Sequence, residues 1–128
     1  MSRSAGRRIL IVDDEPDVTQ MLDRLLSQHG FETYTVNNAL KAVEKAASVR
    51  PDLVILDFIM PDLPGSEVAR MLRGYSATRD VPILFISGSS DEDHRLIAEV
   101  SGATAFLEKP IDSAQLIEKI RGLLGAGP

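Results

Sequence analysis

Residues 53–65 read LVILDFIMPDLPG, and this stretch sets both the expected fold and the candidate site. Four apolar residues lead directly into Asp57, and Phe58 restores the apolar character at once. An ionised carboxylate in apolar surroundings costs several kcal/mol unless it is paired or hydrogen-bonded. The stretch therefore predicts a buried strand at residues 53–56, whose end carries a functional carboxylate and runs into a proline-marked loop.

Short apolar runs alternate with amphipathic segments along the rest of the chain. Runs that are rich in β-branched residues and end in polar or turn residues predict strands. Strands are expected at residues 9–12, 31–36, 53–56, 81–86 and 105–107. Apolar residues at helical spacing follow each run, and they predict a helix there. These helices are expected over apolar stripes within residues 18–26, 39–49, 68–72, 96–100 and 116–124.

The alternation predicts an α/β fold of (βα)₅ type, because continuous apolar strands between helices indicate a parallel sheet covered on both faces. Five strands are too few for a closed eight-stranded barrel, so we expect a doubly wound five-stranded sheet of the flavodoxin-like order 2-1-3-4-5. Residues 31–36 alternate in polarity, as in an edge strand. The inner faces of the second and third helices are expected to include Ala47 and Met71, respectively.

Composition narrows the functional classes. The 128 residues fit one domain, and the net charge of −5 without a basic stripe argues against direct nucleic-acid binding by this domain. The chain contains no cysteine, which excludes thiolate catalysis and cysteine metal sites. No apolar run reaches the about 18 residues of a membrane span, and no apolar signal segment precedes the first strand. We expect a cytoplasmic domain that does not contact the membrane.

Polar side chains end four of the expected strands. Asp13 and Asp14 follow the first strand, Asp57 the third, Ser87 the fourth and Lys109 the fifth. Ligands of open parallel sheets bind outside the carboxyl ends of the strands, so these side chains are expected to share one cleft. Three carboxylates without histidine or cysteine favour a hard cation, Mg²⁺ or Mn²⁺. Asp57 is then a candidate nucleophile toward phosphorus, with Lys109 as a second positive group and Ser87 as a hydroxyl donor.

Each of these residues also has a structural interpretation. Asp14 can be only an N-cap before Pro16, Ser87 can be a turn residue, and Lys109 can simply end a strand. A purely structural interpretation is harder for Asp57, because it follows four apolar residues and precedes no helix that it could cap. The set indicates a site more strongly than any member does, since all of them fall at strand ends on one edge.

Four segments resemble the receiver domain of two-component response regulators. IVDDEP resembles its acidic pair, LVILDFIMPDLPG its phosphoacceptor segment, ILFISG its Ser/Thr strand end and FLEKP its Lys-Pro strand end. The resemblance covers residues 7–124, with flexible tails expected at 1–6 and 125–128. It implies that Asp57 accepts the phosphoryl group. It also implies that Asp13 and Asp14 hold Mg²⁺ with Asp57, directly or through water, and that the Ile59 carbonyl is a further ligand.

The resemblance also implies a switching mechanism. Ser87 hydrogen-bonds the phosphoryl group, Lys109 pairs with it, and Phe106 occupies the place of the family's aromatic switch residue. Ser87 and Phe106 would then change the surface of the fourth helix, fifth strand and fifth helix. The bond between Lys109 and Pro110 is expected to be cis. Beside Asp57, Ile59 and Ser89 occupy positions that govern water access in the family, and the isoleucine cannot orient water, so slow self-dephosphorylation is expected.

The implied protein is a signalling switch and not an enzyme acting on other substrates. Its donor would be a sensor histidine kinase or a phosphotransfer protein, and its output a downstream effector protein or domain. Three alternatives remain. A Mg²⁺-dependent phosphohydrolase of the haloacid dehalogenase class would need an aspartate at Ile59. A flavodoxin-like electron carrier would need a phosphate loop in place of the residues that follow the first strand. The third alternative is an unphosphorylated protein-interaction module.

Overall fold

The computed structural model describes residues 6–88 and 92–125, with the side chains of residues 92–94 left out. The described strands form one parallel sheet in the order β2-β1-β3-β4-β5, so the predicted doubly wound, flavodoxin-like α/β fold is confirmed. The strands are β1 (Arg8–Val12), β2 (Glu32–Val36), β3 (Leu53–Asp57), β4 (Ile83–Ser87) and β5 (Ala105–Glu108). Residues 1–5 and 126–128 of the expected tails lie outside the described residues.

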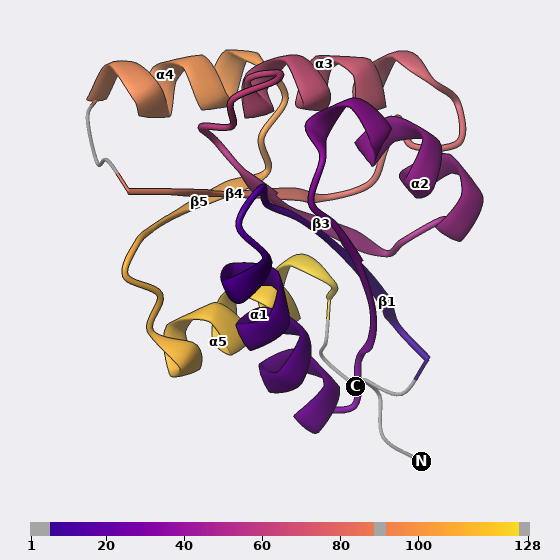
Figure 1. Ribbon diagram of the computed structural model, residues 1–128, viewed down its shortest axis with the longest axis vertical. Coiled ribbons are helices and arrows are strands. Elements are labelled where there is room, and N and C mark those ends of the chain that lie inside the picture. Colours follow the sequence, from indigo (N-terminus) through magenta and orange to yellow (C-terminus); the bar gives the residue numbers. More distant parts are fainter. Residues whose placement is uncertain (1–5, 89–91, 126–128) are drawn as a thin grey trace.

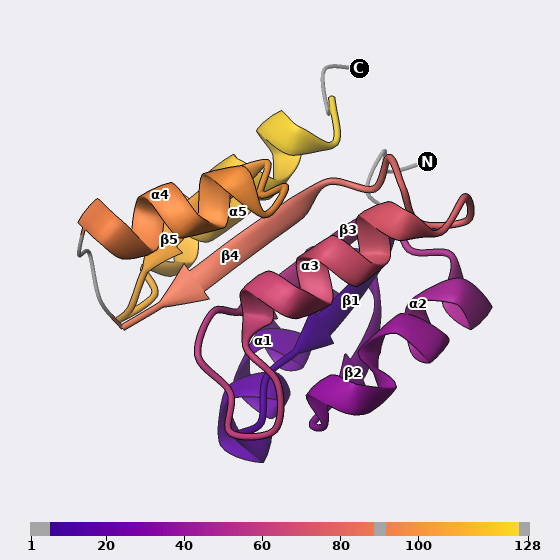
Figure 2. The same cartoon turned by 90° about the horizontal axis from the view of Figure 1, so that it is seen from above.

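Helices cover both faces of the sheet (Figures 1 and 2). Helices α1 and α5 pack on one face, and α2, α3 and α4 pack on the other (Figure 1). The helices are α1 (Pro16–Gln28), α2 (Ala42–Val49), α3 (Gly65–Gly74), α4 (Glu92–Val100) and α5 (Ser113–Leu123). Helices α1 and α5 begin with residues that are typical of helix N-termini. Pro16 is the first residue of α1, and the Asp112 side chain caps α5 by accepting from the N–H groups of Ala114 and Gln115.

Alternate residues of the strands supply two separate cores. Ile9 and Ile11 of β1 point toward the α1 and α5 face, whereas Leu10 and Val12 point toward the α2, α3 and α4 face. Successive side chains of a strand point to opposite faces, and both faces are covered, so the strands read as unbroken apolar runs. The central strands β3 and β4 are buried along their whole length. The sheet therefore holds the end of β3, and with it Asp57, in a fixed position.

Three elements begin later than the sequence suggests, and one of them, β2, does so by a single residue, at Glu32. Strand β4 begins at Ile83, because Pro82 has no N–H for the ladder; its carbonyl still accepts from the Val54 N–H at 2.9 Å. The helix expected from residue 39 starts as a 3₁₀ turn, Ala39–Lys41. Asn38 caps this turn by accepting from the Leu40 N–H at 2.8 Å.

Two residues expected to face inward are exposed. Ala47 of α2 and Met71 of α3 lie on the solvent side, with Met71 40% exposed. The expectation was wrong because a helix on a sheet buries only a limited apolar stripe. Ala46 and Leu72, one residue away from each, occupy that stripe.

The apolar residues that mark α4 in the sequence lie on its outer face. Leu96 is 59% exposed, Ile97 42% and Val100 69%, whereas the small Ala98 is 1% exposed and packs into the core. Helix α4 therefore presents large apolar side chains to solvent beside β5.

Arg73 ties the end of α3 to two loops on the side of the molecule away from the candidate site. Its guanidinium donates to the Gly102 carbonyl at 2.8 and 3.2 Å, to the Arg79 carbonyl at 2.9 Å and to the Val81 carbonyl at 2.6 Å. A planar guanidinium presents several donors in fixed directions, which an ammonium does not. Arg73 thereby connects α3 to the loop between α4 and β5.

Replacing Arg73 with alanine should lower the free energy of unfolding by about 2–3 kcal/mol, because the bound carbonyls lose a charged donor. Arg73→Lys should recover only part of this loss. The matched control is Arg70→Ala on the same helix, whose exposed guanidinium pairs with Glu67 at 3.5 Å and should contribute less than about 0.5 kcal/mol. Urea unfolding followed by circular dichroism measures all three variants. Equal effects of Arg73→Ala and Arg70→Ala would contradict the assignment.

Candidate functional site

The expected polar residues meet at the carboxyl edge of the sheet. Strands β1 and β3 are neighbours, with Val12 paired to Leu56, so the residues that follow these partners lie side by side. Carboxylate oxygens of Asp13, Asp14 and Asp57 all lie within 4.8 Å of one another. Asp13 and Asp57 are buried, at 3% and 5% exposure, while Asp14 is partly open to solvent. The acidic cluster that the strand ends predicted is therefore present.

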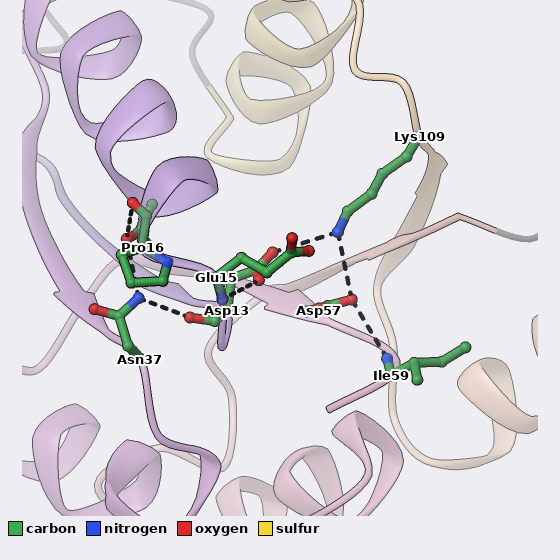
Figure 3. A network of polar contacts seen from close by, with 8 residues as sticks. Asp13, Glu15, Pro16, Asn37, Asp57, Ile59 and Lys109 are labelled. Carbon is green, nitrogen blue, oxygen red and sulfur yellow. Dashed lines mark hydrogen bonds and ion pairs between the residues drawn. The ribbon is translucent and has the colours of Figure 1, made fainter. Parts of the chain in front are cut away.

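Lys109 reaches this cluster from the end of β5 (Figure 3). Its Nζ lies 3.4 Å from Asp13 Oδ2 and 3.8 Å from Asp57 Oδ1. The backbone N–H of Lys109 donates to the Ser87 carbonyl at 2.7 Å, which continues the pairing of β4 with β5 beyond the strand ends. The peptide bond between Lys109 and Pro110 is cis, as expected. The ammonium thus lies between the two buried carboxylates.

Burial raises the pKa of Asp57 from its usual 3.8 to about 7, and the negative charge of Asp13 adds to the rise. The Lys109 ammonium and the Ile59 N–H lower the pKa of Asp57, but they do not offset the burial. One ammonium therefore does not balance the carboxylates of this cluster. A further positive charge beside Asp57 would stabilise the ionised form.

Ile59 contributes a backbone group and not its side chain. Its N–H donates to Asp57 Oδ1 at 3.3 Å, and its side chain is 59% exposed and points away from the carboxylate (Figure 3). Ser87 is fully buried as the last residue of β4. Because Asp57 pairs with Ile86, the serine follows directly after the partner of Asp57. Ser89 lies outside the described residues.

Phe106 of β5 lies half-buried between the sheet and α4. Its ring lies 6.3 Å from that of Phe58 in an edge arrangement, and the Arg95 guanidinium of α4 lies 5.5 Å from the ring centre. Phe58 directly follows Asp57 in the chain. A short path of contacts therefore connects the candidate acceptor with α4.

The turn after β1 leads into α1 and is bound by a residue that follows β2. Asp14 is not the N-cap of α1, because Glu15 occupies that position and makes no side-chain cap hydrogen bond. Asn37, which the sequence reasoning missed, donates through Nδ2 to the backbone carbonyl of Asp13 at 2.8 Å (Figure 3). Asn37 also is a polar residue at the carboxyl end of a strand, the feature by which the other site residues were identified, since it follows the end of β2. Its amide carries no charge, so it did not stand out in the sequence.

Comparison with known proteins agrees with this arrangement. The sequence model of one protein family, the response regulator receiver domain, matches residues 9–121 of this chain. The transcriptional regulatory protein PrrA of Mycobacterium leprae is 38% identical over 117 residues, which cover 91% of this chain and 49% of PrrA. This chain belongs to the response regulator receiver domain family, as the resemblance predicted. It spans about half the length of the curated relatives that it matches.

Solved structures show the same fold. The chemotaxis protein CheY4 of Vibrio cholerae is 28% identical, with a TM-score of 0.89 over 93% of this chain and 99% of CheY4. The receiver domain of the Pseudomonas aeruginosa sensor histidine kinase PA1611 is 27% identical, with a TM-score of 0.87 over 94% of this chain and 99% of that domain. That structure is described with a magnesium ion coordinated in its active-site cleft. Across the residues described here, no helix has the length and apolar character needed to cross a membrane.

Proposed function

We propose that this receiver domain accepts a phosphoryl group on Asp57 from a histidine kinase or a phosphotransfer protein, and that the modification switches its interaction with an effector. The single observation that carries the proposal is the buried carboxylate of Asp57, whose pKa is raised and which lies beside two other carboxylates and one lysine. Membership of the receiver family supports this signalling role over a phosphohydrolase or an electron carrier. The proposed domain spans residues 7–124, with short tails on either side.

The donor set fits Mg²⁺ or Mn²⁺. Asp13, Asp14 and Asp57 offer only hard oxygen atoms, and the Asp14 side is open enough to admit water ligands. We propose these three carboxylates and the Ile59 carbonyl as the metal ligands. The bound ion would neutralise negative charge on the oxygens of the transferring phosphoryl group. The magnesium in the PA1611 receiver domain supports the same assignment.

The protein's own residues account for the transfer. A carboxylate oxygen of Asp57 bonds to phosphorus while the bond from phosphorus to the donor's imidazole nitrogen breaks, and the electron pair of that bond stays with the imidazole. The Lys109 ammonium, 3.8 Å from Asp57 Oδ1, is placed to pair with the phosphoryl oxygens. The Ser87 hydroxyl is proposed to donate to one of them. The phosphoryl group adds about −1.5 to −2 charge at this point.

Switching would follow from this added charge. Movement of Ser87 and Lys109 toward the phosphoryl oxygens would shift the loops after β4 and β5. Phe106 already contacts Phe58 and Arg95, so a shift of β5 would change the position of α4. We propose the surface of α4, β5 and α5 as the region that the effector reads. The exposed Leu96, Ile97 and Val100 lie on this surface.

The proposed partners are therefore proteins. With a net charge of −5, this domain is not expected to bind nucleic acid directly. The relative MtrA of Mycolicibacterium smegmatis is named a DNA-binding response regulator, and this chain matches half of it. An output that acts on DNA through another domain or protein is consistent with that match. We propose that the exchange takes place in the cytoplasm and that the domain catalyses no reaction beyond those at its own Asp57.

The assignment of Asp57 is tested with a small-molecule donor. Wild-type protein with acetyl phosphate and Mg²⁺ should gain one phosphoryl group in the intact mass spectrum, and Asp57→Asn should gain none. Asp62→Asn, in the same loop but exposed, is the matched control and should be labelled like the wild type. Labelling of Asp57→Asn would refute the site. Steady turnover of p-nitrophenyl phosphate would instead support the phosphohydrolase.

We also expect slow self-dephosphorylation, so that the phosphorylated protein has a lifetime longer than minutes in Mg²⁺. The Ile59 side chain offers no polar group to orient water against the phosphoryl group. Ile59→Gln should shorten the half-life several-fold, because an amide can position the attacking water. Met71→Gln, which replaces an exposed apolar residue near the end of α3 that lies away from the site, should leave it unchanged. A wild-type half-life of seconds after removal of the donor would contradict this expectation.

A further inference from the structure

Asn37 links three segments next to the acidic cluster. Its Nδ2 donates to the Asp13 carbonyl at 2.8 Å and to Thr19 Oγ1 at 3.0 Å (Figure 3). The buried Thr19 hydroxyl in turn donates to the Pro16 carbonyl at 3.0 Å. A backbone carbonyl can only accept a hydrogen bond, so the amide atom that faces Asp13 must be the nitrogen. One side-chain amide thus connects the end of β2, the turn after β1 and the first turn of α1.

These contacts fix the peptide groups on both sides of Asp13. The Asp13 N–H donates to the Val36 carbonyl at 3.1 Å, and the Asp13 carbonyl accepts from Asn37. The Asp13 side chain is held as well, because its Oδ1 accepts from the Glu15 N–H at 2.9 Å. The peptide between Asp13 and Asp14 therefore has its orientation set by Asn37, which directly follows the end of another strand, β2.

The orientation of that peptide matters for the site. The carboxylates of Asp13, Asp14 and Asp57 repel one another, and Asp14 is the most exposed of them. Rotation of the peptide would let Asp14 turn toward solvent and relieve this repulsion. Helix α1 has no side-chain N-cap that would hold the turn in its place. The Asn37 amide opposes the rotation through the Asp13 carbonyl.

We propose that Asn37 is a positioning residue of the acidic site, whose amide holds the Asp13–Asp14 peptide so that both carboxylates face one divalent cation together with Asp57. This inference rests on the proposed metal-dependent function. Groups that orient metal ligands typically contribute 10–100-fold to metal affinity. Asn37 acts through the backbone, so we expect an effect at the lower end, of about ten-fold.

The test compares two neighbouring asparagines. Asn37→Ala removes the bridge to Asp13, whereas Asn38→Ala removes only the cap of the 3₁₀ turn, where Asn38 accepts from the Leu40 N–H. Titration calorimetry with Mg²⁺ should give a dissociation constant about ten-fold higher for Asn37→Ala and an unchanged one for Asn38→Ala. Outside the substituted residue and its neighbours in the chain, the largest chemical-shift change of Asn37→Ala should occur at the Asp14 amide, which belongs to the peptide that Asn37 holds. Labelling by acetyl phosphate should be slower at low Mg²⁺ and return to the wild-type rate at saturating Mg²⁺.

The measurements distinguish a failure of the positioning role of Asn37 from a failure of the proposed function. A dissociation constant of Asn37→Ala within two-fold of the wild type would overturn the positioning role while leaving the proposed function intact. An equal loss of affinity in Asn38→Ala would also overturn it, because the effect would then be a general loosening of this loop. If the wild-type protein bound no Mg²⁺, the proposed function would fail and this inference with it.

Discussion

Gly65→Ala should lower the free energy of unfolding by about 3 kcal/mol and should impair the acceptor site at the same time. A methyl group on Gly65 would lie 2.3 Å from the backbone oxygen of Asp57, 2.9 Å from the Cα of Phe58 and 3.0 Å from the Phe85 ring. The first two atoms belong to the backbone at the end of β3, so no side-chain rotation can make room. Either α3 or the end of β3 must move.

This close approach follows from the shape of the loop. The Gly65 N–H donates to the Phe58 carbonyl at 2.9 Å, which closes the loop that follows Asp57 and brings the start of α3 against the strand end. The same glycine therefore serves packing and the position of the acceptor. The backbone conformation at position 65 does not require glycine. Glycine is needed there because the backbone of Asp57 and Phe58 leaves no space for a side chain.

Gly74→Ala is the matched control, because Gly74 ends the same helix and a methyl group there would have no atom within 4 Å. That substitution should be neutral or stabilise α3 by less than about 1 kcal/mol. Urea unfolding followed by circular dichroism measures both variants. If Gly65→Ala were as stable as the wild type, the close packing of α3 against β3 would be wrong.

Removing the charge of Asp57 should stabilise the metal-free protein at neutral pH. The pKa of Asp57 rises from 3.8 to about 7 on folding, chiefly through burial. Below pH 4 the carboxyl is protonated in both the folded and the unfolded state, so the folded protein bears no penalty. Between pH 4 and 7 the unfolded state ionises first, and stability falls with rising pH. Above pH 7 the penalty is complete.

The variant Asp57→Asn cannot ionise at this position, so its stability relative to the wild type should grow from pH 4 to 7 and then level off. Because a pKa unit corresponds to about 1.4 kcal/mol, the raised pKa of Asp57 corresponds to an advantage on the order of a few kcal/mol at pH 8. Urea unfolding in a chelator buffer, repeated across this pH range, measures the difference. An advantage that is independent of pH would contradict the charge argument.

Magnesium should reduce or reverse the stability advantage that Asp57→Asn has over the metal-free wild type. A cation bound among the carboxylates stabilises the folded state only, so saturating Mg²⁺ should raise the stability of the wild type more at pH 8 than at pH 5. The effect should be smaller for Asp57→Asn, which lacks one proposed ligand. Asp62→Asn should follow the wild type at every pH. Equal stabilisation of the wild type and Asp57→Asn by Mg²⁺ would exclude Asp57 as a ligand.

Much of this molecule follows from its sequence. The apolar runs and the helical stripes predicted every strand and helix that the structure describes, and the positions of Asp13, Asp14, Asp57 and Lys109 at strand ends predicted that they share one cleft. These patterns are informative because burial on both faces of a parallel sheet leaves a continuous apolar run, and because all carboxyl ends of such a sheet lie on one edge.

Other features depend on how the elements pack. Periodicity identified the apolar side of α4, but the sheet buries Ala98 and leaves Leu96 and Val100 exposed, because the width of the buried stripe depends on the neighbouring elements. Asn37 is an ordinary polar residue in the sequence and becomes a link to Asp13 only when β2 lies beside β1. The sequence by itself determined the order of the elements and the chemical groups at the edge of the sheet. Only the tertiary structure decided three other features: the raised pKa of Asp57, the lack of space for a side chain at position 65, and the hydrogen bond from Asn37 that holds the Asp13–Asp14 turn. Each of them depends on distances between residues that are far apart in the chain.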